Sequence, residues 1–81
     1  MKNNKVHISY KYLRYSEGDN SLELDIEPLK SGSSIIYIPK KEKWNELFGE
    51  WAIYRRKEIL ANIIKKLEEN YNMEMYNFQE Y

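Results

Sequence analysis

The sequence predicts an α+β fold: an antiparallel meander of three strands, with a fourth strand left open, packed against one long C-terminal helix. Three features carry this prediction: two stretches of alternating apolar and polar residues, a short apolar run between turn residues, and a helical stripe of apolar residues after residue 50. With 81 residues, the chain is expected to form a single domain over residues 1–81.

The first expected strand covers residues 6–15, where β-branched and aromatic side chains recur with a period of two. One face would carry Val6, Ile8, Tyr10 and Tyr12, and the other would carry His7, Ser9 and Lys11. Residues 16–20 predict a turn, because Gly18 tolerates a positive φ and both Asp19 and Asn20 can bond to their own backbone.

The second expected strand covers residues 21–28 and alternates more regularly. Leu22, Leu24 and Ile26 would face one way, and Glu23, Asp25 and Glu27 the other. Pro28 cannot donate to a strand ladder, so it ends the strand or marks an edge. After a turn, residues 34–38 (SIIYI) form the third expected strand, whose two apolar faces predict a central or helix-covered position.

The second half of the chain is predicted to be mainly helical. Residues 40–48 form either a short helix or a loop, and a helix over about residues 50–70 carries an apolar stripe suited to packing on a sheet. Trp44, Phe48 and Trp51 are expected to close the core, or alternatively to form an exposed anchor for a partner. The tail, residues 71–81, either adds a fourth strand or docks as a terminus.

The composition argues against an enzyme. There is no cysteine, so disulfides, thiolate metal sites and thiol nucleophiles are excluded, and the lone His7 makes a poor metal site. No serine lies in a G-x-S-x-G elbow. We therefore expect neither catalysis nor a cofactor. The absence of cysteine, of a signal-like N-terminus and of a membrane-length apolar run predicts a soluble cytoplasmic protein.

An acidic strand face is the first candidate binding site. Glu23, Asp25 and Glu27 would project from one side of the second strand at intervals of about 7 Å. Such a face is either ordinary solvated surface or a docking surface for a protein, and Tyr10 and Tyr37 would flank it. A catalytic carboxylate pair is disfavoured, because it needs a concave, partly dry pocket.

Basic residues near the start of the long helix provide an alternative site. Lys40, Lys41, Arg55, Arg56 and Lys57 could bind phosphates, which would make the protein a small nucleic-acid-binding regulator of phage or mobile-element type. The balanced charge, 13 basic against 13 acidic side chains, argues against a general nucleic-acid binder. A third hypothesis is self-association as a homodimer through the sheet edge or the tail.

The order of the segments resembles a family of small bacterial immunity proteins of polymorphic toxin systems. An apolar strand leads into a tryptophan (SIIYIPKKEKW, with Trp44), and a helix containing Ile59 and Ile63 follows (RRKEILANIIKKL). The resemblance covers roughly residues 6–67, but the chain lacks an acidic, proline-containing loop after Trp44 and has a longer helix and tail. It implies a non-catalytic protein that binds and blocks one toxin. No membrane partner is expected, because the sequence has no membrane-length apolar run.

Overall fold

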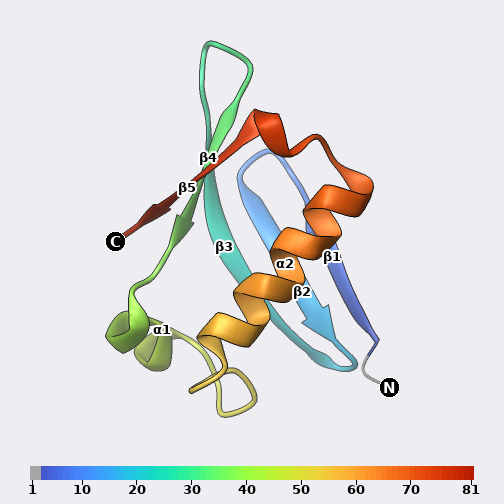
Figure 1. Cartoon of the computed structure of the whole chain (residues 1–81). Coiled ribbons are helices and arrows are strands. Elements are labelled where there is room, and N and C mark those ends of the chain that lie inside the picture. Colours follow the sequence, from blue (N-terminus) through green and yellow to red (C-terminus); the bar gives the residue numbers. More distant parts are fainter. Residues whose placement is uncertain (1–2) are drawn as a thin grey trace.

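The computed structural model describes residues 3–81 and shows an α+β fold with a five-stranded mixed sheet and two α-helices among those residues (Figure 1). The elements are β1 (Asn4–Ile8), β2 (Tyr12–Glu17), β3 (Asn20–Pro28), β4 (Ser34–Ile38), α1 (Lys41–Leu47), α2 (Arg56–Asn70) and β5 (Tyr76–Glu80). A short 3₁₀ turn, Met73–Met75, leads from α2 into β5.

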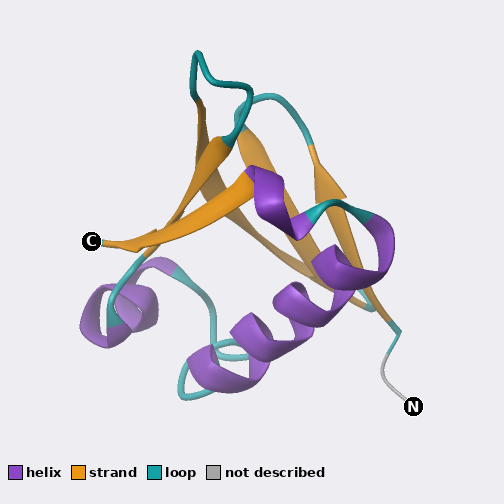
Figure 2. Ribbon diagram, turned by 45° about the horizontal axis from the view of Figure 1, so that its top comes forward, coloured by secondary structure: helices purple, strands orange, loops and turns teal. Residues whose placement is uncertain are grey.

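The sheet has the order β1-β2-β3-β4-β5, and β3 joins its two halves. Residues 20–25 of β3 pair with β2, whereas residues 26–28 pair with β4. The neighbours from β1 to β4 are antiparallel, and β5 runs parallel to β4. Because β3 changes partner along its length, β4 and β5 diverge from the β1–β3 layer (Figures 1 and 2).

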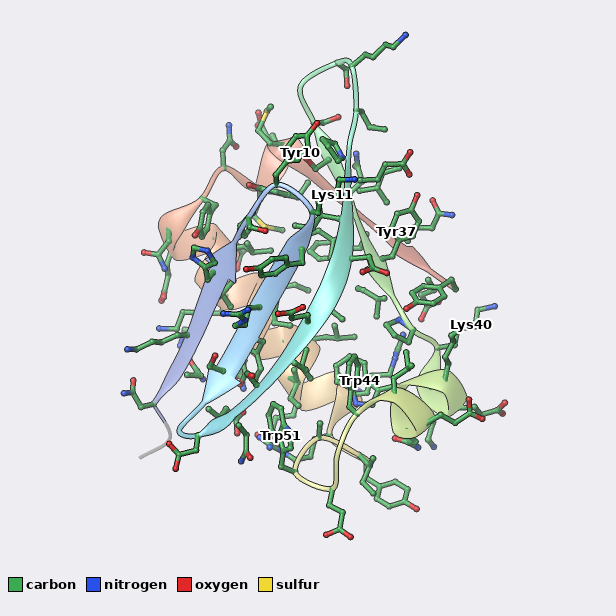
Figure 3. The ribbon with its side chains drawn as sticks, turned by 180° about the vertical axis from the view of Figure 1, so that it is seen from behind. Tyr10, Lys11, Tyr37, Lys40, Trp44 and Trp51 are labelled. Carbon is green, nitrogen blue, oxygen red and sulfur yellow. The ribbon has the colours of Figure 1, made fainter. Side chains whose placement is uncertain are left out.

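Helix α2 covers one face of the β1–β3 layer, and the core lies between them (Figure 2). Three side chains of α2 are fully buried against apolar residues of β2, β3 and β4: Ile59, Ile63 and Leu67. The strand residues in this core are Leu13, Tyr15, Leu22, Leu24, Ile26, Ile36 and Ile38. Within residues 3–81, no helix lies on the opposite face of the β1–β3 layer, so its side chains are open to solvent (Figure 3).

The segment between β4 and α2 closes one end of this core. Trp44 of α1 is fully buried, its indole Nε1 donates to the Ala52 carbonyl at 3.0 Å, and its ring meets Phe48 edge-on at 4.7 Å. Trp51 is half-buried and its ring stacks beside Tyr15, with 6.3 Å between the ring centres. These aromatic residues belong to the core and its rim, so the expectation that they close it is confirmed.

The expected single strand over residues 6–15 is wrong, because the chain turns back after Ile8. The Ser9 amide donates to the Tyr12 carbonyl at 2.8 Å, and two antiparallel strands result. A continuous strand would place Val6 and Ile8 on the face opposite Leu13. The turn changes the phase of the alternation, so that Ile8 pairs with Leu13 and both face α2. Burial of more apolar surface explains the hairpin.

Two further expectations need correction. The long helix begins at Arg56 rather than near residue 50, because residues 50–54 form turns that direct Ala52 into the core and place Tyr54 at a φ of 64°. The tail does contain a further strand, but β5 is parallel to β4, so the sheet is not an antiparallel meander. Two helices intervene between β4 and β5, and such a crossover connects parallel strands.

Candidate functional site

The open side of the sheet displays the acidic residues of β3. Glu23, Asp25 and Glu27 are exposed, while the alternate residues of the strand point into the core. Cross-strand pairing sets the neighbours of two of them, since Arg14 lies opposite Glu23 and Tyr12 lies opposite Asp25. The structure therefore brings the three expected carboxylates together on one accessible surface.

Three tyrosines surround these carboxylates. Tyr37 of β4 donates its hydroxyl proton to Glu27, and this bond raises the pKa of the Tyr37 phenol. Tyr81 meets the Tyr37 ring edge-on, with 6.3 Å between ring centres. Partial burial, and then the nearby charge of Asp25, raise the pKa of Tyr81. We call the surface formed by Glu23, Asp25, Glu27, Tyr12, Tyr37 and Tyr81 the tyrosine–carboxylate face.

Arg14 partly neutralises this face. Its guanidinium binds the Glu23 carboxylate through Nε at 3.1 Å and Nη2 at 2.8 Å, and it lies over the Tyr12 ring at 5.2 Å from the centroid. The bond to Glu23 raises the pKa of Arg14. Asp25 and Glu27 consequently carry most of the negative charge that a partner would meet.

Tyr10, the other expected flanking residue, lies away from the strands. It occupies the turn between β1 and β2, where it is 72% exposed, and the labels in Figure 3 show it at one end of the sheet. Tyr12 was expected on the same face as Val6 and Ile8, but it points to the open side, because the turn reverses the chain. The tyrosine–carboxylate face therefore contains Tyr12 where Tyr10 was expected.

The basic residues divide into two groups. Lys40, Lys41 and Lys57 are exposed. Arg55 instead binds Glu17 at 2.9 Å and Glu58 at 2.8 Å, and these two carboxylates raise its pKa, Glu58 through the larger effect.

Arg56 is also held inside the fold. Its Nε donates to the Pro39 carbonyl at 2.8 Å, and its Nη2 lies 2.6 Å from a Glu80 carboxylate oxygen. The five basic residues thus do not form one patch of free cations, and the two arginines anchor α2 to the sheet and to the segment after β4.

Sequence reasoning missed Arg14, Tyr81 and Glu17. The position of Arg14 could have been predicted, because a two-residue turn at Gly18 and Asp19 fixes the strand register that sets Arg14 opposite Glu23. No comparable signal places Tyr81. It reaches the face only because β5 pairs in parallel with β4 and because two backbone bonds hold Tyr81 just after the end of β5. The Tyr81 amide donates to the Ile38 carbonyl, and the Tyr81 carbonyl accepts from the Lys40 amide.

Comparison of the chain with protein-family models, curated proteins and solved structures finds no match. None of the helices within residues 3–81 is both long and apolar enough to cross a membrane. In the same part of the chain, no three histidine, aspartate or glutamate side chains gather as ligands for a metal ion.

Proposed function

We propose that the protein is a non-catalytic binding module, an inhibitor of the immunity-protein type, that docks a basic protein surface onto the tyrosine–carboxylate face. The observation that carries the proposal is this face itself: three carboxylates of β3 and three tyrosines lie on the side of the sheet that no helix covers. Tyrosine is enriched at protein interfaces, where its ring contributes apolar area and its hydroxyl a hydrogen bond.

The chemistry of the face suits arginine and lysine side chains of a partner. Carboxylates accept paired hydrogen bonds from a guanidinium, and tyrosine rings attract cations to their faces. The protein's own cations already use both contacts. Arg14 binds Glu23 beside the Tyr12 ring, and the Lys43 ammonium lies 4.9 Å from the centre of the Tyr81 ring.

A toxin that acts on nucleic acid would be a suitable partner. Such an enzyme presents positive charge to the phosphates of its substrate. An acidic face would complement that surface and accelerate association by long-range attraction. Occupation of the basic cleft by this module would then exclude the nucleic acid, which gives inhibition without any catalytic step.

The decisive experiment compares two variants with the same loss of charge. The first, E23Q/D25N/E27Q, neutralises the tyrosine–carboxylate face. The second, E68Q/E69Q/E74Q, removes three exposed acidic groups from the end of α2 and the segment after it. Tagged proteins are used to capture partners from a native lysate, and the activity of any captured protein is measured with increasing amounts of each variant.

The proposal requires that the wild type and E68Q/E69Q/E74Q both capture one protein and inhibit it at a one-to-one ratio. E23Q/D25N/E27Q should bind the same protein with a slower association rate and a flatter dependence of that rate on salt. Equal association rates for all three proteins would exclude this face. Capture of a protein whose activity is unaffected would exclude an inhibitor, and a capture of nucleic acid alone would favour the second candidate below.

The second candidate is a nucleic-acid-binding regulator that uses Lys40, Lys41 and Lys57. These lysines are exposed at the starts of the two helices, Lys40 and Lys41 at α1 and Lys57 in α2. The internal bonds of Arg55 and Arg56 leave fewer cations for phosphates than the sequence suggested. This candidate predicts retention on duplex DNA that weakens steeply with salt.

A further inference from the structure

A surface hollow of about 270 Å³ lies between α1 and the start of α2, outside the sheet. Its lining residues are Lys41, Asn45, Tyr54, Arg56 and Lys57. Lys41 and Asn45 are four residues apart on α1, a spacing that places both on one side of a helix. None of these residues belongs to the tyrosine–carboxylate face, so the hollow is a separate feature of the molecule.

Among the residues that the structure describes, the lining carries three cationic side chains and no carboxylate. Glu80 offsets the charge of Arg56 from outside the lining, and the Pro39 carbonyl fixes the guanidinium in place. Lys41 and Lys57 are both exposed. Like charges that converge on one hollow repel one another, and an anion held between them would offset that repulsion.

Asn45 adds a neutral donor to the hollow. Its side-chain Oδ1 accepts a hydrogen bond from the Tyr54 backbone amide at 3.3 Å. An asparagine amide that accepts through oxygen has its two N–H groups left for another acceptor. The same bond ties the loop before α2 to α1, which holds both sides of the hollow together.

Tyr54 projects into solvent from a strained backbone. Its φ of 64° lies in the left-handed region, which is unfavourable for a residue with a Cβ. Tyr54 is 83% exposed, so its burial does not offset this cost. An exposed aromatic ring beside cations is the arrangement that stacks against a planar group attached to a phosphate.

We infer that this hollow binds a phosphate group, held by Lys41 and Lys57 with Arg56 and the Asn45 amide as further donors. The group is either free inorganic phosphate or the phosphate of a small nucleotide whose base stacks on Tyr54. The site does not depend on the tyrosine–carboxylate face, and its test is independent of the proposed inhibitor function.

The test follows the backbone amide shifts of the full ¹⁵N-labelled chain during titration with inorganic phosphate, at constant ionic strength maintained with sodium chloride. Saturable shifts are expected at residues 41, 45 and 54–57. The K41Q/K57Q variant should weaken binding at least about tenfold, because it removes two charge-assisted contacts. The matched control K30Q/K65Q, which removes two exposed lysines elsewhere, should bind as the wild type does.

A parallel titration with adenosine monophosphate distinguishes the two sources of the phosphate. If adenosine monophosphate binds more tightly than inorganic phosphate, and Tyr54→Ala abolishes this difference in affinity, the hollow is a nucleotide site. Equal affinity for the two ligands identifies a site for the phosphate group alone. The inference is overturned if neither ligand gives saturable shifts, if K30Q/K65Q weakens binding as much as K41Q/K57Q, or if only polymeric DNA binds.

Discussion

Arg55 and Glu17 are 38 residues apart in the sequence, yet the guanidinium Nη2 and the carboxylate Oε2 lie 2.9 Å apart. Glu17 ends β2 and is 8% exposed, and its carboxylate also accepts the Tyr15 hydroxyl proton. Arg55 immediately precedes α2 and donates to the Trp51 carbonyl at 2.7 Å. This arrangement fixes the start of the helix against the inner face of the sheet.

Replacement of Arg55 by methionine is expected to lower the free energy of unfolding by roughly 3–5 kcal/mol, since it removes the cation from a buried carboxylate. Glu17→Gln should cost less, about 1–2 kcal/mol, because an amide oxygen still accepts hydrogen bonds. Urea denaturation of both variants and of the double variant gives the coupling energy. A coupling near zero would show that the pair does not fasten α2 to the sheet.

The Arg14–Glu23 pair on the open face is the natural comparison. It has a similar distance, 2.8 Å, but both side chains are about half exposed. Water screens such a pair, so Arg14→Gln is expected to lower the free energy of unfolding far less than Arg55→Met does. Equal costs for Arg14→Gln and Arg55→Met in urea denaturation would show that burial does not strengthen the Arg55–Glu17 pair.

Stability should fall at alkaline pH because of Tyr15. Burial, and then the hydrogen bond to Glu17, raise the pKa of this phenol from 10.0 to about 12. Between these two values the unfolded chain loses the proton while the folded chain keeps it, so the stabilisation present below pH 10 is lost as the pH rises to 12. A shift of this size corresponds to roughly 2–3 kcal/mol.

Urea denaturation from pH 9 upwards measures this loss, and Tyr15→Phe should have a flatter profile than the wild type. Some slope will remain, because the pKa of Tyr37 and that of Tyr81 are also raised in the folded protein. Tyr54→Phe removes the hydroxyl of a residue that is 83% exposed, and it serves as the matched control. Identical profiles for Tyr15→Phe and wild type would contradict the assignment.

The local pattern of the sequence predicted those parts of the fold that depend on the apolar face of a single strand or helix. Alternation in β3 placed the acidic residues outside and Leu22 and Leu24 inside, and the apolar stripe predicted α2. The prediction of the first strand was wrong because the alternation continues through a tight turn. Val6 and Tyr12 have matching parity in the sequence but opposite faces in the sheet, and only the pairing of Ile8 with Leu13 reveals this.

Contacts between distant segments explain what else was missed. No local pattern tells which acidic residue meets Arg55, or that the tail returns beside β4 in a parallel direction. The tyrosine–carboxylate face combines both situations: its carboxylates follow from strand periodicity, whereas Tyr81 reaches them only through the position of β5.

Among the aromatic residues, Trp44 should contribute most to the packing of α1 on the core. Its ring is fully buried and its indole N–H donates to the Ala52 carbonyl. Trp44→Ala is expected to cost roughly 3–5 kcal/mol through the cavity that it leaves. Trp44→Phe should cost roughly 1–3 kcal/mol, because it leaves the Ala52 carbonyl without this donor.

Trp51 provides the control, because its ring is only half-buried and stacks beside Tyr15 at the rim of the core. Trp51→Phe keeps an aromatic ring there and should cost less than Trp44→Phe in urea denaturation. Fluorescence emission spectra give a second measure. Trp51→Phe, which retains only Trp44, should emit at shorter wavelength than Trp44→Phe, which retains only Trp51, since only the Trp44 indole is fully shielded from water. The opposite order would place Trp44 at the surface and refute the packing of α1 on the core.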